Sequence, residues 1–337
     1  MSCRRVFRRG RGVGLLVTAL VVTACSAGTA ESTVTSSAQP PAATSSPSTT
    51  IGAVPADSTT TTTTTPWDGP CGRPGAAATS YDHVIWIWME NKDRSAVFDS
   101  NKAPFLHGLA EACGTASNYV DHGIHPSLPN YIAATTGATQ GVFDDGDPRQ
   151  HKLSVDNIFR QVRAIGNTSK SYEEAMPANC LLQSSGRYAV KHNPAAYFVG
   201  GDDRTACEQD NVPFDQFLSD LAGGLPNFAM ITPDMCNDTH DCPVATGDKW
   251  LSDVVARITE SSTYRDGRTA LFVVFDESEG AGTTPFVAVA PSIVPGTVAD
   301  GQLDHYALLA FTEDALGITD HLGKAADAPS MAQAFGL

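Results

Sequence analysis

The sequence predicts an α/β protein built on a mainly parallel β-sheet. Short apolar runs with little polar alternation are typical of strands that are covered on both faces. Segments with helical periodicity fall between these runs, and this alternation favours a parallel sheet flanked by helices. Residues 68–337 contain no internal repeat and no second linker, so we expect one large folded domain there.

Four apolar runs are the predicted strands, and four amphipathic segments are predicted helices. The strands cover residues 83–89, 228–232, 270–275 and 286–290. The helices cover residues 155–164, 213–221, 249–261 and 306–316. In sheets of this kind ligands bind beyond the carboxyl ends of the strands, so the residues that follow each strand are the first candidates for a functional site.

Residues 1–25 are typical of a bacterial export signal, with an arginine-rich start, an apolar run at 13–22 and small residues before Cys25. This order resembles a lipobox and predicts a lipid anchor on Cys25, although cleavage as an ordinary signal peptide nearby is an alternative. Arg4 and Arg5 also resemble a twin-arginine signature, which leaves the export route open. We expect an exported protein of the cell envelope, lipid-anchored to the outer face of the membrane, or a secreted one.

Residues 26–67 are rich in Ser, Thr, Ala and Pro. Such a composition cannot bury a hydrophobic core, so this segment is predicted to be a disordered tether. Removal of the signal takes five arginines away and leaves 17 of the 22 basic residues against 37 acidic ones, a formal charge of −20. Most of this charge serves solubility, but it also disfavours nucleic acid as a partner and favours a small substrate in a locally positive, metal-containing pocket.

Six cysteines remain after the signal, and an even number outside the cytoplasm predicts disulfides. They are Cys71, Cys113, Cys180, Cys207, Cys236 and Cys242. Sequence proximity favours the pairs Cys236–Cys242 and Cys180–Cys207, which leaves Cys71 with Cys113, but the sequence does not choose among the possible pairings. A zinc site is the alternative, and it is disfavoured because the chain has no matching CxxC pairs.

Oxygen-bearing side chains follow two of the predicted strands. Glu90 and Asn91 come directly after residues 83–89, and Asp276 and Glu277 come directly after residues 270–275. Such hard oxygen donors suit Mg²⁺, Ca²⁺ or Mn²⁺, with Zn²⁺ possible. Acidic residues at one strand end often do no more than solvate a loop, but two such strands together favour a divalent metal site.

Ser127 stands at the start of a segment that is predicted to form a helix through Thr136, which Gly137 should end. The start of a helix offers free N–H groups and a favourable dipole to a phosphate. A serine there can act as a nucleophile if a metal or a base removes its proton, and the alternative is a simple helix N-cap. His125 and Asn130 make the surrounding segment polar.

Six segments in fixed order resemble one protein family. They are ENKDRSAVF, HPSLPNYIAATTG, YEEAMP, VKHNP, ITPDMCNDTHDC and FDESEG, and they span the chain from about Asp82 onward. Together they are similar to the bacterial and fungal acid phosphatases that are grouped with the non-haemolytic phospholipases C. The resemblance implies an alkaline phosphatase-like α/β/α sandwich of three layers, an acidic pH optimum, and a metal-bound nucleophile at Ser127. It also implies that the other metal ligands are Glu90, Asn91, Asp276 and Glu277, the four residues that the strand ends indicate.

The histidines are harder to assign. His192 and His240 lie in segments that resemble histidine-bearing family motifs, so either could contact the phosphate or protonate the leaving group. His125 is a third candidate, and Asn130 and His305 are weaker candidates for substrate contact. A structural role is the alternative for each of them. Glu173 and Glu174 are expected in a solvated loop, with a place at the site entrance as the alternative.

These features predict a metal-dependent acid phosphatase that cleaves small phosphate monoesters through a phosphoserine at Ser127. A phospholipase C or phosphodiesterase is the first alternative, although we expect it less because the chain lacks the long additional C-terminal region of the phospholipase relatives. A non-catalytic lipoprotein that binds phosphorylated ligands is the second, and the presence of a nucleophile among metal ligands disfavours it. The sequence does not indicate the metal, the physiological substrate or the oligomeric state.

Overall fold

The computed structural model describes residues 69–76, 80–280 and 282–337. The predicted export signal at residues 1–25, the lipidated Cys25 and the tether at residues 26–67 lie outside the described residues and stay predictions. Within the described part of the chain, none of the helices combines the length and the apolar character that a membrane crossing requires.

An eight-stranded sheet forms the centre of the domain, in the order β5-β4-β6-β1-β7-β8-β2-β9. In chain order the strands are β1 His83–Met89, β2 Gly114–Ala116, β4 Ser169–Glu173, β5 Asn211–Pro213, β6 Phe228–Thr232, β7 Thr269–Phe275, β8 Phe286–Val289 and β9 Thr297–Ala299. Strands β5, β4, β6, β1 and β7 are mutually parallel, and β8 is antiparallel to both of its neighbours. A separate two-stranded sheet pairs β3 Tyr119–Val120 with β10 Leu303–Asp304. The prediction of a mainly parallel α/β fold is confirmed.

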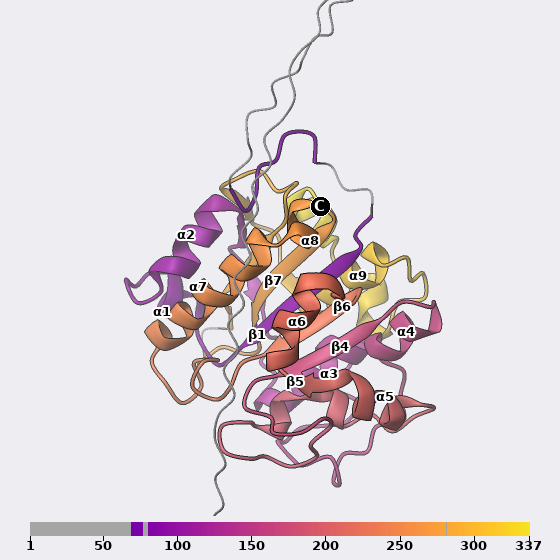
Figure 1. Cartoon of the computed structure of the whole chain (residues 1–337). Coiled ribbons are helices and arrows are strands. Elements are labelled where there is room, and N and C mark those ends of the chain that lie inside the picture. The colour runs from indigo at the N-terminus through magenta and orange to yellow at the C-terminus, as the bar shows by residue number, and fades with distance from the viewer. Residues whose placement is uncertain (1–68, 77–79, 281) are drawn as a thin grey trace, which may run out of the picture. The chain divides into compact units, whose positions relative to one another are not determined.

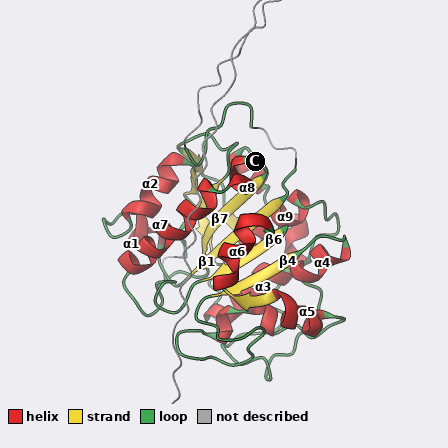
Figure 2. Cartoon of the chain, viewed as in Figure 1, coloured by secondary structure: helices red, strands yellow, loops and turns green. Residues whose placement is uncertain are grey.

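Helices flank this sheet in two groups (Figures 1 and 2). One group packs around α7 and contains α1 Arg94–Phe98, α2 Pro104–Ala112, α6 Asp215–Gly223, α7 Val244–Glu260 and α8 Ser262–Arg265. The other packs around α9 and contains α3 Ser127–Thr136, α4 Ile158–Ala164, α9 His305–Ala315, the 3₁₀ turn η3 Gly323–Asp327 and α10 Met331–Phe335. The 3₁₀ turns η1 Val190–His192 and η2 Pro194–Ala196 and the helix α5 Asp203–Asp210 lie near β4 and β5.

The core lies on both faces of the central strands. Every residue of β6 and β7 is buried, and in β1 only His83 is partly exposed. Trp86 and Trp88 of β1 are fully buried and point to the same helical layer: Trp86 donates to Thr312 of α9, and Trp88 packs on Tyr131 of α3. Both contacts fall on the α9 side of the sheet, because the two side chains alternate with residues that point to the α7 side. Burial on both faces explains why these strands read as continuous apolar runs.

The predicted strands agree with β1, β6, β7 and β8 to within a residue at each end. Helix α7 begins at Val244 rather than at residue 249, with Pro243 at its N-cap, and Asp248 in its second turn accepts hydrogen bonds from the N–H groups of Phe105 and Leu106. Strand β4 was not predicted, since its sequence SKSYE is polar. The expectation of a solvated loop at Glu173 is wrong, because Glu173 ends β4 and is buried.

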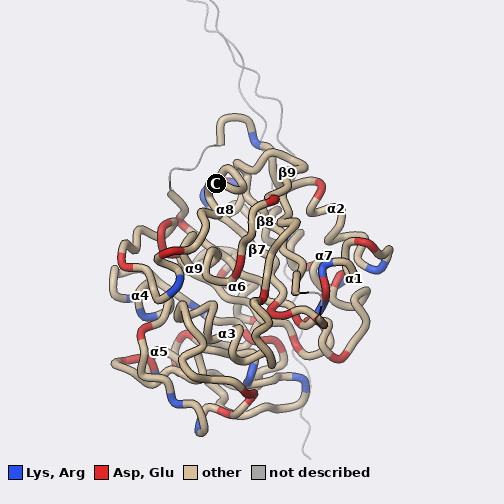
Figure 3. The backbone as a smooth tube through the Cα atoms, turned by 180° about the vertical axis from the view of Figure 1, so that it is seen from behind, with Lys and Arg blue, Asp and Glu red and all other residues tan. Residues whose placement is uncertain are grey.

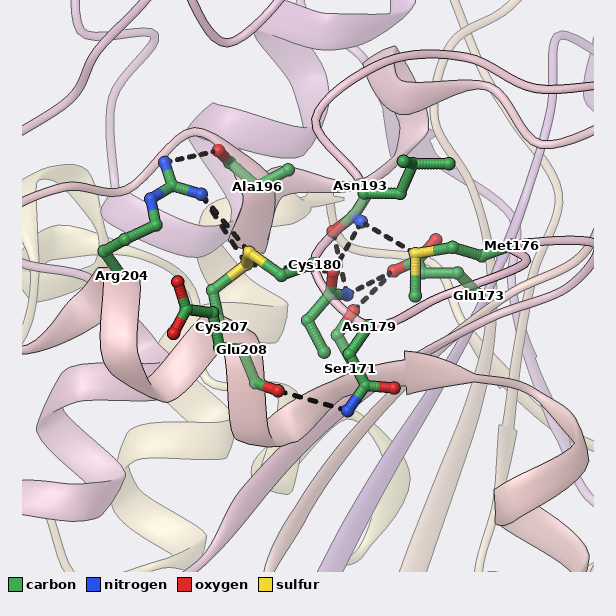
Figure 4. Close-up of a disulfide and its surroundings, with 12 residues drawn as sticks. Ser171, Glu173, Met176, Asn179, Cys180, Asn193, Ala196, Arg204, Cys207 and Glu208 are labelled. Carbon is green, nitrogen blue, oxygen red and sulfur yellow. Dashed lines mark hydrogen bonds between the residues drawn. A yellow bond between two sulfur atoms is a disulfide. The ribbon is translucent and has the colours of Figure 1, made fainter.

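Three disulfides join the pairs that sequence proximity favours: Cys71–Cys113, Cys180–Cys207 and Cys236–Cys242. The predicted pairing is therefore confirmed over the zinc alternative. Figure 4 shows Cys180–Cys207 between the guanidinium of Arg204 and a buried polar cluster that includes Glu173 and Asn193. Disulfides of this number are typical of proteins that fold outside the cytoplasm.

Candidate active site

The carboxyl ends of β1 and β7 meet at one edge of the sheet. Met89 pairs with Phe275 in parallel register, so the next residues, Glu90 and Asp276, stand side by side. Both carboxyl groups are buried. The N–H of Asn91 donates to Asp276 Oδ1 at 2.9 Å. The structure thus brings together the residues that the two strand ends indicated.

Ser127 lies at the first position of α3, as the sequence predicts, and the helix ends at Gly137 in the left-handed conformation with φ 75°. Its hydroxyl donates to Glu90 Oε2 at 2.9 Å, and the hydroxyl of Tyr131, one turn later, donates to Glu90 Oε1. Pro126, not Ser127, occupies the N-cap position. The serine therefore points its oxygen at the carboxylate cluster instead of capping its own helix.

The side-chain amide of Asn91 faces the same cluster. One end of this amide lies 3.1–3.2 Å from carboxylate oxygens of Glu90, Asp276 and Glu277. Hydrogen bonding alone favours the nitrogen at that end, whereas a metal ion requires the oxygen there. Oxygen ligands about 2.1 Å from an octahedral ion stand roughly 3 Å from one another, so the observed spacing suits ligands of one ion.

Glu277 is held by residues around Ser127. His125 Nδ1 lies 2.7 Å from Glu277 Oε2, and the amide of Asn130 donates to the same oxygen at 3.2 Å. Asn130 also donates to the backbone oxygen of Ile124 at 2.8 Å, which fixes the segment before the helix. The geometry gives Asn130 a role in orienting Glu277 rather than the predicted contact with substrate, while His125 remains half-exposed beside the site.

The loop after β6 closes the other side of the site. The disulfide Cys236–Cys242 closes this loop. The loop backbone is bonded to the residue that follows β1, because Glu90 N donates to Asp238 O at 2.8 Å. Thr239 Oγ1 donates to Glu90 O at 2.8 Å. These bonds place the buried carboxyl group of Asp238 near the carboxyl group of Glu90.

His192 lies between two carboxyl groups at the end of the 3₁₀ turn η1. Its Nε2 is 3.3 Å from Glu90 Oε2 and its Nδ1 is 3.4 Å from Asp238 Oδ2. The ring stacks on Tyr131, with centroids 5.3 Å apart and an interplanar angle of 7°. Burial lowers the pKa of His192, so the ring is neutral and one of its nitrogens offers a lone pair.

His240 faces Lys191 with one ring nitrogen and Asp241 with the other. Its Nδ1 is 2.8 Å from Asp241 Oδ1, and its Nε2 is 3.4 Å from Lys191 Nζ. Because an ammonium group only donates, Nε2 accepts here and Nδ1 carries the proton. Glu90, His192 and His240 can offer ligand atoms within 4.8 Å of one another, which forms a second donor set that shares Glu90 with the first.

His305 lies behind the site. Its Nε2 is 2.7 Å from the backbone oxygen of Asp276, its Nδ1 is 3.0 Å from the hydroxyl of Tyr119, and the ring packs against Trp88. With both nitrogens engaged and the ring buried, His305 supports the end of β7. This placement favours a positioning role over the predicted contact with substrate.

The residues of the cluster fit a divalent cation. Burial first, and then the charge of Glu277, raises the pKa of Asp276 to about 7, and burial raises that of Asp238 to about 8. Burial and the neighbouring Asp276 also raise the pKa of Glu90 well above its usual range, so this set of carboxyl groups resists full ionisation without a compensating cation. Among the described residues, His192 Nε2 and Asp238 Oδ2 are buried without a hydrogen-bond partner. Buried polar groups normally have one, so these atoms also fit a place beside an ion.

An open cavity of about 370 Å³ gives access to the cluster, and Asn91, His125, His240 and Glu277 line it. Lys92, at its rim, is paired with Glu279. Along the backbone of the domain, Asp and Glu are widely distributed with fewer Lys and Arg between them (Figure 3). A negatively charged substrate therefore needs local positive charge at this cavity.

Four residues near the site were not predicted as functional: Tyr131, Asp145, Lys191 and Asp238. Three of them fall inside the segments HPSLPNYIAATTG, VKHNP and ITPDMCNDTHDC, so their position within these segments was the available signal. Asp145 gave no such signal, and its Oδ1 accepts from the N–H of Leu128 at 3.1 Å.

Comparison with known proteins shows the family of the chain. A sequence model of the Phosphoesterase family matches residues 79–319. The chain is 28% identical over 277 residues to a phosphatidylinositol-3-phosphatase of Mycobacterium tuberculosis, covering 80% of this chain and 89% of that relative. It is 30% identical over 263 residues to a probable acid phosphatase of Kluyveromyces lactis, covering 73% of this chain and 60% of the yeast protein, so it spans less than two thirds of that relative.

The fold has solved counterparts. A protein of the alkaline phosphatase superfamily from Vibrio parahaemolyticus superimposes with a TM-score of 0.52 at 12% identity, covering 78% of this chain and 74% of that one. This likeness confirms the alkaline phosphatase-like fold and, at such low identity, carries no more than the fold. The chain belongs to the Phosphoesterase family, whose members are hydrolases of phosphoric ester bonds.

Proposed function

We propose that the protein is a metal-dependent phosphatase that cleaves phosphate monoesters through a phosphoserine at Ser127. The observation that carries this proposal is the hydrogen bond from Ser127 Oγ to Glu90 Oε2 at 2.9 Å, at the start of a helix and within a cluster of potential metal ligands. A serine in such a place is oriented for attack on phosphorus, and a cation held by its neighbours would stabilise its alkoxide.

Glu90, Asn91, Ser127, Asp276 and Glu277 would hold the ion. Their hard oxygen donors suit Mg²⁺, Ca²⁺ or Mn²⁺, and Zn²⁺ is compatible as well. When bound, the divalent ion supplies electrostatic stabilisation of the serine alkoxide and of the phosphoryl oxygens. Glu90 and Asn91, directly after β1, and Asp276 and Glu277, directly after β7, would supply ligands to it, and the first turn of α3 holds Ser127 beside them.

The reaction then has two displacement steps. Ser127 Oγ forms a bond to phosphorus while the bond between phosphorus and the ester oxygen breaks, and the alcohol leaves with a proton. Water subsequently attacks the phosphoserine, which releases inorganic phosphate and returns the proton to Ser127. Before the first step the carboxylate of Glu90, which also accepts from Tyr131, orients the hydroxyl of Ser127.

The leaving alcohol needs a proton, and three histidines are near enough to be candidates. His240 and His125 line the cavity, whereas His192 is buried beside Glu90. His240 remains our first candidate, with the condition that Nε2 must gain a proton and turn from Lys191 toward substrate. His192, neutral and stacked on Tyr131, is better placed to orient Glu90 or to bind phosphate.

Two kinds of monoester are compatible with the relatives. Small soluble phosphate esters fit the acid phosphatases among them, and the mycobacterial relative is named for a phosphoinositide. The predicted lipid anchor at Cys25 would place the domain near such lipids. A phosphodiesterase or phospholipase C and a non-catalytic phosphate-binding lipoprotein remain the alternatives.

A panel of substrates separates these possibilities. Purified protein should be assayed with a phosphomonoester, a phosphodiester, phosphatidylcholine and a phosphatidylinositol monophosphate, each with and without a chelator. We expect turnover of the monoesters that chelation abolishes and divalent metal restores. Faster cleavage of the diester or of phosphatidylcholine would refute the monoesterase proposal, and binding of phosphate without turnover of any ester would favour the binding lipoprotein.

A further inference from the structure

We propose that Lys191 is the fixed second cation of this active site. Its ammonium group binds phosphoryl oxygens of the substrate. It also takes the place of a second metal ion beside Glu90, His192 and His240, so that the site holds one divalent ion rather than two. This inference rests on the proposed phosphatase function, and it concerns how the site supplies positive charge.

Two bonds hold the Lys191 ammonium in place. Its Nζ lies 3.0 Å from Asp145 Oδ2 and 3.4 Å from His240 Nε2. The other carboxylate oxygen of Asp145 accepts from the N–H of Leu128, the residue after the nucleophile. Asp145 therefore ties the ammonium to the first turn of α3, on the phosphate side of Ser127.

Other sources of positive charge near Ser127 are already used. Of the first three residues of α3, Leu128 gives its N–H to Asp145, and Pro129 has none. The helix start thus offers fewer free N–H groups to a phosphate than an ordinary helix N-terminus does. Lys92, at the cavity rim, donates to the backbone oxygen of Asn91 and to Glu279. Among the described residues, Lys191 is the lysine whose ammonium contacts both His240 and Asp145, the acceptor of the Leu128 N–H.

A ligand can reach this ammonium. Lys191 lines a cavity of about 450 Å³ together with Asp145, Tyr188 and Asp241. His240, which it contacts, lines the cavity that opens on the proposed metal ligands. Lys191 thus lies between the two cavities, where the phosphoryl group would bind with its ester group extending outward.

The same position explains the unused donor set. Glu90, His192 and His240 have the residue types and spacing of a metal site. The nitrogen of His240 that is free of Asp241 is Nε2, and this nitrogen already accepts from Lys191. A divalent ion bound there would stand against the ammonium group, and the repulsion between like charges in a buried site opposes this. With Lys191 in place, the three residues receive one positive charge without a second ion.

The experiment compares Lys191→Ala and Lys191→Arg with the wild type in the absence of any phosphate ester, so that no turnover occurs and Ser127 stays in place as a proposed metal ligand. The metal content is measured after dialysis against excess Zn²⁺, and the binding of inorganic phosphate is measured by calorimetry on the metal-loaded proteins. Lys249→Ala, which removes an exposed positive charge on α7, is the matched control. Thermal melts establish that each variant is folded.

We expect one Zn²⁺ per chain in the wild type and in Lys191→Arg. We expect two in Lys191→Ala, because Glu90, His192 and His240 can then bind a second ion. If Lys191→Ala fails to fold, Lys191→Gln replaces it with the same expectations. Phosphate affinity should fall at least about tenfold in Lys191→Ala at one ion per chain, which is set with limiting metal, and should change little in Lys249→Ala.

Two ions per chain in the wild type, or a single ion in folded Lys191→Ala at excess Zn²⁺, would overturn the role of Lys191 as the second cation. Unchanged phosphate affinity in Lys191→Ala would overturn its role in binding the phosphoryl group. None of these readouts requires turnover. A failure of the proposed phosphatase function would instead appear in the substrate panel with the wild-type protein, so the two failures are distinguishable.

Discussion

Replacement of Glu173 by Gln should stabilise the protein near neutral pH. Glu173 ends β4, is fully buried, and accepts a hydrogen bond from Ser171 Oγ at 2.6 Å and a longer one from Asn211 at 3.4 Å. Figure 4 shows it in the polar cluster beside Cys180–Cys207. Burial raises the pKa of Glu173 to about 8, so the folded protein keeps this carboxyl group protonated at neutral pH.

The magnitude follows from proton linkage. The unfolded chain releases the proton near the ordinary Glu value of 4.5, and the folded chain does so near 8. Between these values the folded state binds more protons than the unfolded state, so the free energy of unfolding falls as the pH rises, by about 1.36 kcal/mol per pH unit. A glutamine keeps the shape and the acceptor and has no proton to take up. The advantage of Glu173→Gln over the wild type should therefore grow by about 2 to 3 kcal/mol between about pH 5 and about pH 7.

Urea unfolding of both proteins at several pH values between these limits, in the same metal, measures this difference. The metal site is the same in the two proteins, so its own pH dependence cancels in the comparison. Glu260→Gln makes the same change on an exposed side chain and should leave the wild-type pH dependence as it is. An advantage for Glu173→Gln that stays constant with pH to within about 0.5 kcal/mol would refute the reasoning.

Further predictions concern the site itself. Ser127→Ala should lower kcat by at least about a thousandfold with an unchanged melting temperature, and activity within about tenfold of wild type would contradict a covalent role. Asp276→Asn and Glu90→Gln should each lower metal content as well as activity, which metal analysis of the purified variants checks. His240→Ala should slow esters of poorly acidic alcohols far more than activated aryl esters, whereas equal losses on both would assign His240 a structural or binding role. Because burial and mutual repulsion raise the pKa values of the site carboxyl groups, chelated protein should lose thermal stability as the pH rises from about 5 to about 8, and saturating metal should remove that loss.

The sequence predicts the centre of the site because parallel strands end at one edge of the sheet. Glu90 and Asp276 follow two strongly apolar strands, so their neighbourhood depends only on those strands being adjacent in the sheet. The position of Ser127 depends on one local element, a helix with a clear start and a glycine at its end. Both arguments use short stretches of chain, and short-range patterns are the most readable part of a sequence.

The rest of the site depends on contacts that no local pattern encodes. Lys191 and Asp238 belong to a 3₁₀ turn and a disulfide-closed loop, which have no periodicity to indicate their direction. Strand β4 has a polar sequence because Ser171 and Glu173 satisfy one another within the buried cluster. The free N–H groups expected at the start of α3 are reduced because Asp145, from a later loop, takes the one at Leu128. Tertiary partners decide each of these features.

The charge of the molecule explains why so much depends on a few cations. The chain carries an excess of acidic residues, and the proposed metal ligands add several carboxyl groups at the place where a phosphate must bind. Without a cation, these groups would repel the substrate that Ser127 attacks. The proposed ion and Lys191 would reverse the local sign of the potential, and Asp145 holds the ammonium of Lys191 in place. Loss of metal should therefore weaken substrate binding and the activation of Ser127 together, since both depend on positive charge at the same edge of the sheet.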